Sequence, residues 1–485
     1  MNVNPITRLD YPDLDVIRVE DTYYMVSTTM HFMPGCEILQ SFDLVHWEHA
    51  TYVYETLDHT DAQQLKSGQN IYGQGMWAAS LRYHEGRFYI CFVANDTRKT
   101  YLYTSEKIDG PWKKQLIEGF YHDGSLLFDE DGRNYIVYGN DEIWITELNE
   151  DLTAPKKDGL HRLLVSDHKN PELGYEGSHI QKINGYYYIF LIHSLRDRWM
   201  RTEACFYSDS LEGEFTGGDV LCDDRGYCGQ GVAQGGIVDT PDGKWYAMLF
   251  QDSGAVGRIP ILLPVTWKDH FPFFGQNGHV PEEIEVHSTR PGYIYQPLVG
   301  SDDFCNGLLP RWQFNHDPDP RYYHLDALQG TYTITTREVC TELTQAVNTL
   351  TQRMSYPSCA AEVTVDASAL KEGDVAGLCA LQSCYAAVGI TKHHGKYEVL
   401  MLDKKEDGIL DMTEGTVVES HQMDFRLEAD FCNMKDEARC YYRVNKGDWL
   451  PIGTVHKLYF KLDHFTGCRF GLFCYAAEET GGSAC

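Results

Sequence analysis

The first 250 residues repeat one pattern of apolar and polar positions five times. In each copy a short apolar segment leads into a polar turn, and an aromatic-rich apolar segment follows. Four of the turns carry a glycine, which a tight hairpin needs where its backbone takes a positive φ angle. The pattern therefore predicts a β-hairpin in every copy. The copies are residues 13–24, 77–89, 123–135, 176–188 and 234–246.

The spacing of the copies predicts the architecture of the N-terminal part. The copies begin 46 to 64 residues apart, which is enough for a four-stranded sheet with its loops. A plain β-sandwich would not need hairpins repeated at this period. We therefore expect a five-bladed β-propeller over residues 1–292.

The chain changes character between residues 293 and 303, where the repeat stops. From residue 302 onward, short segments of alternating apolar and polar residues follow one another between turn residues. This pattern predicts an antiparallel β-sandwich over residues 302–485. Long helical periodicity is scarce throughout, so the fold class is expected to be all-β.

The aligned first position of each copy carries a polar or aromatic side chain. In a propeller, equivalent positions at the start of the innermost strands face one central axis. Three carboxylates, an indole and an amide are therefore expected to meet in one funnel. These residues are Asp13, Trp77, Asp123, Glu176 and Gln234.

Three explanations compete for this set. Each acid caps a strand turn, or the acids hold a cation such as calcium, or a pair of carboxylates hydrolyses a glycosidic bond. Like charges raise one another's pKa, so three gathered carboxylates need a chemical reason. Trp77 beside the acids favours the third explanation, because an aromatic face stacks on a sugar ring while polar groups bind its hydroxyls.

Composition excludes several other functions. The chain has 71 acidic and 41 basic residues and a net charge of −30, which disfavours nucleic acids and anionic membrane surfaces as partners. No apolar segment approaches the roughly 18 residues of a membrane span, and none follows Met1, so we expect a cytoplasmic protein. The 15 cysteines include no Cys-x-x-Cys pair, which predicts reduced thiols and no zinc site.

Six ordered motifs resemble glycoside hydrolase family 43, whose members are β-xylosidases, α-L-arabinofuranosidases and arabinanases on a five-bladed propeller. The likeness covers about residues 4–270 and continues into the second domain through WQFNHDPDP and NTLTQRM. The motifs are NPITRLDYPDLDVIRVEDTYYMVSTT, MHFMPGCEILQSFDLVHWE, GMWAASLRYHEGRFYICF, FYHDGSLLFDEDGRNYIVYGN, YEGSHIQKINGYYYIF and GGIVDTPDGKWYAMLFQDSGAVGRIPILLPVTW.

The resemblance implies a role for each acid. Asp13 corresponds to the general base, Glu176 to the general acid, and Asp123 to the residue that orients the acid and tunes its pKa. The substrate-binding residues implied by the resemblance and by the funnel are Trp77, His31, Phe32, Met33, Gln234 and Arg258.

Two positions depart from the family pattern. Asp15 follows Asp13 on the same strand face, which makes it a supporting residue or a rival base. Ala233 stands where many members carry a histidine that anchors a central cation or water, which weakens the case for a bound metal. We therefore expect no metal in the site and no required cofactor, with a structural calcium ion as a minor alternative.

The family resemblance implies an inverting reaction, in which an acid and a base lie ~6.5–9.5 Å apart on either side of the sugar. Arg258 is expected to lower the pKa of Asp13, while the Asp123 charge and partial burial raise that of Glu176. In similar two-domain members of the family the second domain narrows the funnel to a pocket, and this resemblance implies an exo-acting enzyme. We therefore expect release of terminal β-D-xylose, and of α-L-arabinofuranose as a side activity, from xylo-oligosaccharides or arabinoxylan fragments. A preference for arabinofuranose, a non-catalytic sugar-binding propeller, and assembly as a homo-oligomer remain alternatives.

Overall fold

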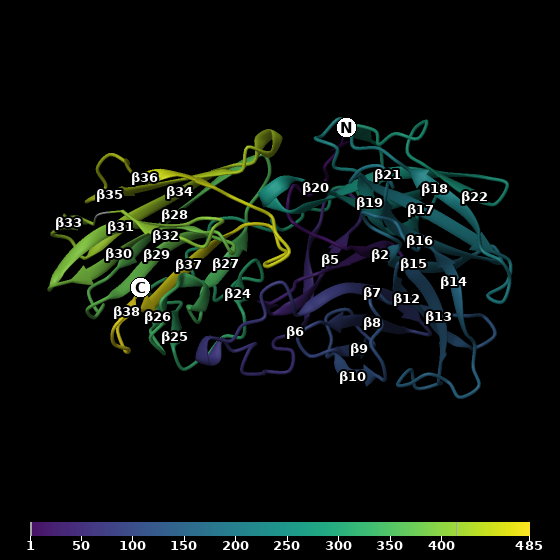
Figure 1. The fold of residues 1–485 in the computed structure, drawn as a ribbon, viewed down its shortest axis with the longest axis horizontal. Coiled ribbons are helices and arrows are strands. Elements are labelled where there is room, and N and C mark those ends of the chain that lie inside the picture. The colour runs from purple at the N-terminus through teal and green to yellow at the C-terminus, as the bar shows by residue number, and fades with distance from the viewer. Residues whose placement is uncertain (1, 414) are drawn as a thin grey trace.

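The computed structural model describes residues 2–413 and 415–485, and strands joined by turns make up nearly all of it. Figure 1 shows two bodies side by side, with the sheets of the N-terminal part on the right and those of the C-terminal part on the left. Within the described residues no helix is long and apolar enough to cross a membrane. The helical turns are η1 (Lys66–Gly68), η2 (Gly254–Val256), η3 (Leu343–Gln345) and η4 (Cys432–Met434).

Five four-stranded antiparallel sheets confirm the predicted propeller, and each sheet is formed by one continuous stretch of chain. Blade one contains β2 (Asp15–Val19), β3 (Thr22–Ser27), β5 (Gly35–Ser41) and β6 (Glu48–Tyr54). Blade two contains β7 (Met76–His84), β8 (Arg87–Ala94), β9 (Lys99–Ser105) and β10 (Lys113–Ile117). Blade three contains β11 (Ser125–Phe128), β12 (Asn134–Asn140), β13 (Glu142–Leu148) and β14 (His161–Ser166). Blade four contains β15 (Glu176–Ile183), β16 (Tyr186–Ser194), β17 (Arg201–Ser208) and β18 (Thr216–Leu221). Blade five contains β19 (Val232–Asp239), β20 (Trp245–Asp252), β21 (Arg258–Lys268) and β22 (Phe271–Phe274).

The predicted hairpins are the two innermost strands of each blade. Gly86 and Gly185 occupy their turns with φ angles of 77° and 86°, a conformation that glycine adopts without strain. Because each hairpin starts at the same end of its blade, the five first positions lie at one end of the channel, which we call the mouth.

The N-terminal segment closes the ring between blades five and one. β1 (Asn2–Val3) pairs with β23 (Glu283–Ile284), which follows blade five. The Asn4 side chain donates to the Leu262 carbonyl at 2.8 Å and accepts from its N–H at 3.0 Å. Arg18 of β2 donates to the Asp239 carboxylate of β19 at 3.1 Å. These contacts fix Asp13, between Asn4 and Arg18, against blade five.

The C-terminal part is the predicted β-sandwich. Its core lies between a four-stranded sheet and a nine-stranded sheet, and includes Leu378, Val388, Phe425 and Leu427. The four-stranded sheet contains β28 (Ser358–Asp366), β34 (Gln422–Asp430), β35 (Glu437–Arg443) and β36 (Leu450–Lys457). The larger sheet contains β4 (Phe32–Met33), β24 (Gln313–Asn315), β27 (Leu350–Arg353), β29 (Asp374–Leu381), β30 (Ala386–His393), β31 (Lys396–Lys404), β32 (Leu410–Met412), β33 (Thr416–Val418) and β37 (Arg469–Ala476). A separate small sheet contains β25 (Tyr323–Asp326), β26 (Thr331–Thr335) and β38 (Ser483–Ala484).

A shared sheet and a buried ion pair join the two bodies. Strand β4 leaves the blade-one loop of the propeller and pairs with β24 of the sandwich. Arg353 of the sandwich reaches Glu37 of blade one at 2.8 Å, and both side chains are buried. Burial raises the pKa of Glu37, but Arg353 and His49 together outweigh it and hold that pKa at about 2. The sandwich is therefore fastened to one side of the propeller mouth.

Candidate active site

The backbone is unusual at the positions that the repeat singled out. Asp13, Asp123 and Gln234 have φ angles of 50°, 47° and 58°, which cost on the order of 1–3 kcal/mol each and concentrate at functional sites. In blade four, Gly177 directly after Glu176 takes this conformation at 64°. The ladder between the two innermost strands also shifts register near the mouth in blades two, four and five. Such bulges re-aim side chains next to active sites.

Asp13 is nearly buried and fully hydrogen-bonded. Arg258 Nη1 donates to its Oδ1 at 2.7 Å and Thr28 Oγ1 donates to its Oδ2 at 2.9 Å. Burial raises the pKa of Asp13 above its ordinary value, although Arg258 opposes the rise. The expectation that Arg258 would give Asp13 a low pKa is wrong in its net direction, because the loss of solvent outweighs the guanidinium. A raised pKa makes the Asp13 carboxylate a stronger base.

Asp15 is excluded as a rival base by its partners. It is fully buried, with Arg82 Nη1 at 2.6 Å, the Leu81 N–H at 2.8 Å and His179 Nδ1 at 3.2 Å. Although burial raises the pKa of Asp15, Arg82 and His179 outweigh it and hold that pKa at about 2. Asp15 therefore ties the innermost strands together below the mouth.

His122 lies between the other two acids. Its Nε2 is 3.6 Å from Asp123 Oδ2 and 3.8 Å from Glu176 Oε2. The Asp123 carboxylate raises the pKa of His122 to about 9, so the imidazole is protonated at neutral pH. This positive charge explains how two of the three acids can share the mouth. The sequence analysis missed His122, although its position directly before Asp123 was a usable signal.

Backbone and amide donors fix the orientation of the same two acids. The Gly177 N–H donates to Asp123 Oδ2 at 3.0 Å, and Asn140 Nδ2 donates to Glu176 Oε2 at 2.8 Å. Asp123 of blade three thereby contacts the residue that follows the expected general acid. This arrangement matches the orienting role that the family resemblance implies for Asp123.

Among the described residues, His122, Asp123 and Glu176 form the one group with donor atoms close enough to hold a metal, all within 4.8 Å of one another. Calcium takes six to eight oxygen ligands, whereas this set offers two carboxylates and an imidazole. The donor set therefore suits a proton-sharing network better than a calcium site.

Gln234 also faces this network. A Cβ at Gly177 would lie 2.7 Å from Gln234 Cδ, so the amide packs directly against the Glu176 segment. The Gln234 N–H donates to Glu203 Oε2 at 2.7 Å. Burial raises the pKa of Glu203 well above its ordinary value, which favours the neutral form of this carboxyl group. The sequence analysis missed Glu203, which lies near the start of β17 and outside the repeated positions.

The sandwich contributes an aromatic ring to the mouth. The Phe465 ring centroid is 5.5 Å from that of Trp77, and the Arg258 guanidinium carbon lies 4.4 Å from the Phe465 centroid. Trp77 also packs against His122, with centroids 5.8 Å apart. The pocket wall is therefore built by both domains. No local pattern around Phe465 marks this role in the sequence.

His31, Phe32 and Met33 lie in the junction with the sandwich, and at most 1% of each is exposed. The His31 ring packs against Phe32, Tyr72, His316 and His464 with centroids 4.3–4.9 Å apart. These contacts place the segment in the domain junction, and its expected role in the pocket wall stays a prediction. Its side chains hold the two domains together.

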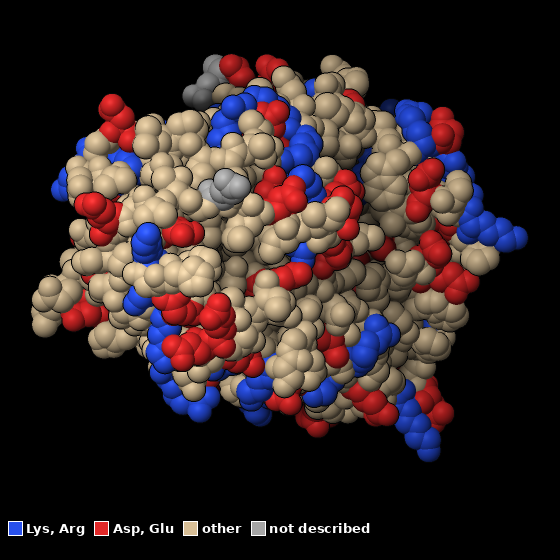
Figure 2. All heavy atoms as spheres, turned by 60° about the vertical axis from the view of Figure 1, so that its left-hand side comes forward, with Lys and Arg blue, Asp and Glu red and all other residues tan. Residues whose placement is uncertain are grey.

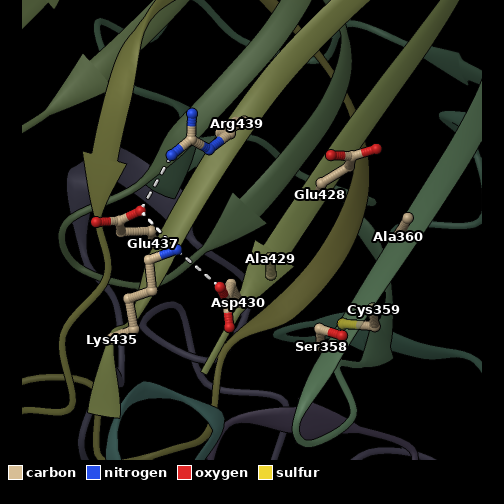
Figure 3. A pocket seen from close by; sticks show the side chains of 9 residues that line it. All are labelled: Ser358, Cys359, Ala360, Glu428, Ala429, Asp430, Lys435, Glu437 and Arg439. Carbon is tan, nitrogen blue, oxygen red and sulfur yellow. Dashed lines mark hydrogen bonds and ion pairs between the residues drawn. The ribbon is translucent and has the colours of Figure 1, made fainter. Parts of the chain in front are cut away.

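A separate hollow of about 500 Å³ lies on the outer face of the four-stranded sheet of the sandwich. Figure 3 shows Lys435, Asp430, Glu437 and Arg439 paired with one another, and Glu428, which lies apart from them, pairs with Arg426 at 2.6 Å. Lys435 contacts Asp430 at 2.8 Å and Glu437 at 3.4 Å, and Arg439 contacts Glu437 at 3.3 Å. With its charges paired and no aromatic platform, this hollow lacks the chemistry of the mouth.

Comparison with known proteins agrees with this geometry. The sequence profile of Glycosyl hydrolases family 43 matches residues 3–272, and that of the Beta xylosidase C-terminal Concanavalin A-like domain matches residues 301–485. A β-xylosidase of Formosa agariphila is 26% identical over 99% of this chain and 88% of its own length. A non-reducing end α-L-arabinofuranosidase of Bacteroides ovatus is 24% identical over 84% of this chain and 79% of its own length.

Solved structures give the same picture. A bifunctional Bacteroides eggerthii protein that combines a family-43 part with a second part named CE superimposes with a TM-score of 0.93 and 42% identity over the whole of this chain. The present chain spans 62% of that protein's length. A family-43 glycoside hydrolase with an engineered active site superimposes with a TM-score of 0.86 and 28% identity, over 99% of this chain and 98% of its own.

Proposed function

The chain belongs to glycosyl hydrolase family 43, and on this premise we propose that it is an exo-acting, inverting β-xylosidase. It is a glycoside hydrolase of a family that acts on xylan-type carbohydrates. The observation that carries the finer proposal is the division of the acids: Asp13 is held on blade one by Arg258, while Glu176 and Asp123 lie with His122 on blades four and three.

In this mechanism Asp13 accepts a proton from the attacking water, and Glu176 donates a proton to the leaving oxygen on the other face of the sugar. Arg258 and Thr28 hold the Asp13 carboxylate, and its raised pKa favours proton abstraction near neutral pH. Asn140 donates to the Glu176 carboxylate, and the Asp123–His122 pair lies beside it, so these groups fix its orientation. Hydrolysis by this route requires no cofactor.

The position of the sandwich supports the proposal of exo action. Phe465 lies against Trp77 and Arg258 and so closes one side of the mouth. Closure on one side favours binding of the end of a sugar chain over binding across its middle. Trp77 provides an aromatic face for that sugar, and Gln234 is a candidate partner for its hydroxyls.

Surface charge supports a neutral oligosaccharide as the substrate. The net charge is −30, and Figure 2 shows acidic and basic side chains interspersed on the face it presents, with no continuous basic area. An uncharged sugar chain is not repelled by such a surface, unlike a nucleic acid or an anionic lipid.

A preference for α-L-arabinofuranose is the second candidate, since a relative bears the name of a non-reducing end α-L-arabinofuranosidase. The deciding experiment measures kcat/KM on aryl β-D-xyloside, aryl α-L-arabinofuranoside and xylo-oligosaccharides. Asp13→Ala and Glu176→Ala serve as controls. A β-xylosidase hydrolyses the xyloside and releases xylose stepwise from oligosaccharides. Faster cleavage of the arabinofuranoside would favour the second candidate, and activity surviving both substitutions would contradict the proposed roles.

A further inference from the structure

The loop Leu195–Met200 of blade four lies at the rim of the mouth beside the general acid. Strand pairing places Ser194, the end of β16, opposite Arg201, the start of β17. Glu176 pairs with Ile192, two residues before the end of the same strand. The loop therefore projects from the hairpin that Glu176 pairs with, on the mouth side of it.

Trp199 in this loop is 44% exposed, which is unusual for so large an apolar side chain. The Arg201 guanidinium lies over one of its faces, 5.5 Å from the ring centroid. Arg201 forms an ion pair with Asp252 of blade five, which fixes its position. Arg201, which Asp252 holds in position, therefore supports one face of the Trp199 indole.

Trp199 is linked to the catalytic centre through stacked groups. Arg201 also lies over the Phe250 ring at 5.2 Å, and Arg258, the partner of Asp13, lies over the same ring at 5.4 Å. Trp199 is therefore at the rim of the site that holds Asp13, rather than on a distant surface.

The two sides of the mouth differ in how they are covered. Sandwich residues bond to blades one and five through Asp10–Gly467 at 2.7 Å and Ala255–Cys468 at 2.8 Å. Within the part of the chain that the structure describes, no hydrogen bond or ion pair joins the sandwich to Leu195–Met200. The sandwich is thus not bonded to the mouth on the blade-four side, where Glu176 lies, and we take this side as its open side. A general acid protonates the leaving oxygen, so the leaving part of the substrate departs on this side.

We propose that Trp199 is the stacking platform for the sugar unit on the leaving-group side of the scissile bond. The inference rests on the proposed function and adds to it the residue that recognises the rest of the oligosaccharide. The exposed face of the indole meets the apolar face of a pyranose, while the Arg201 side keeps the ring in place. Trp199 thereby makes the enzyme select oligosaccharides over substrates that have no sugar on the leaving side.

The test compares two substrates in the full-length enzyme. β-D-Xylosyl fluoride has no sugar or ring on the leaving side, whereas xylotriose has two sugars there. Trp199→Ala is expected to lower kcat/KM on xylotriose roughly tenfold or more, mainly through KM, and to leave the fluoride within about twofold. Trp199→Phe should restore most of the loss. Phe273→Ala is the matched control, since Phe273 is 49% exposed on the outer strand of blade five.

Each outcome is informative. Equal losses on both substrates, or an unchanged xylotriose value, would overturn the platform while leaving the proposed function intact. If the unsubstituted enzyme cleaves neither substrate, the proposed function fails and the platform fails with it.

Discussion

Asp13 and Arg258 are 245 positions apart in the chain, yet their side chains meet at 2.7 Å at the propeller mouth. The first belongs to the segment that enters blade one, and the second begins the third strand of blade five. Their contact therefore depends on closure of the whole ring. It also binds the expected general base to the last structural unit of the catalytic domain.

The roles of the two neighbouring acids are separable by mutation. Asp13→Asn is expected to lower kcat by ~10²–10⁴-fold with little change in fold, because it removes the base but keeps the side-chain shape. Asp15→Asn leaves Arg82 without its buried partner, so it should lower the free energy of unfolding by about 3–5 kcal/mol while the folded fraction retains activity. Rates normalised by active-site titration measure the loss of activity, and denaturant unfolding curves measure the loss of stability. Together they distinguish the two variants. Loss of chemistry in folded Asp15→Asn enzyme would reverse the assignment.

Glu176→Gln should remove the basic limb of the pH profile of kcat/KM, because the group whose proton is needed no longer titrates. The loss should be ~10²–10⁴-fold on xylobiose, whose leaving sugar needs protonation, and much smaller on an aryl xyloside with an acidic leaving group. Glu142→Gln is the control, since Glu142 lies on β13 outside the acid cluster. A basic limb that survives in Glu176→Gln would assign the acid to another residue.

The pH dependence of the base can be tested through Arg258. Burial raises the pKa of Asp13 and Arg258 opposes it, so removing the positive charge should raise that pKa further. Asp13 acts as the base only when it is ionised. The acidic limb of the pH profile of kcat/KM should therefore move to higher pH in Arg258→Met. Arg258→Lys keeps the charge and should keep the limb near its original position. A limb that moves to lower pH in Arg258→Met would contradict the ion pair.

The domain junction should make the protein sensitive to mild acid. His31, His316 and His464 are fully buried, and burial lowers the pKa of each, to about 3 for His464. These histidines stay neutral in the folded protein but take up protons when it unfolds. Their contribution to the stability of the folded state is therefore full above about pH 6.5 and falls as the pH drops below that value. Each of the three histidines lowers the free energy of unfolding by about 1.4 kcal/mol for every pH unit below pH 6.5.

Thermal unfolding between pH 7 and pH 5 checks this expectation. The melting temperature should fall over that window, where ordinary carboxylates do not yet titrate. The melting temperature of His464→Asn should fall less steeply, because about one proton fewer is taken up on unfolding. The surface variant His168→Asn is the control, since His168 is exposed. An equally steep fall in His464→Asn would show that the junction does not sense acid.

The repeat in the sequence was sufficient to predict the blades and the convergence of their first positions. It succeeded because hairpin periodicity and turn glycines are local properties, and Asp13, Asp123 and Glu176 fall at equivalent places in that period. Phe465 could not be found this way, since its contact with Trp77 depends on how a separate domain docks. The pKa of Asp13 was mispredicted for a similar reason: the burial that raises it is produced by the closed ring and not by neighbours in the sequence.

The same limit applies to His31, Phe32 and Met33. Their motif marks a connection between two strands of blade one, but the sequence does not say that β4 in this connection joins the sheet of the sandwich. The partner strand lies more than 280 residues away, so the motif alone does not indicate that this segment also forms part of the domain junction.

The central claim is that Asp13 and Glu176 act as base and acid on opposite faces of one terminal sugar. Proton NMR of the first-formed product tests this most directly, recorded on an aryl β-D-xyloside before mutarotation. The account predicts α-D-xylose as the initial product, with the β-anomer appearing only as solution equilibrium is approached. Initial release of β-D-xylose would mean retention, and the assigned roles of the two carboxylates would then be wrong.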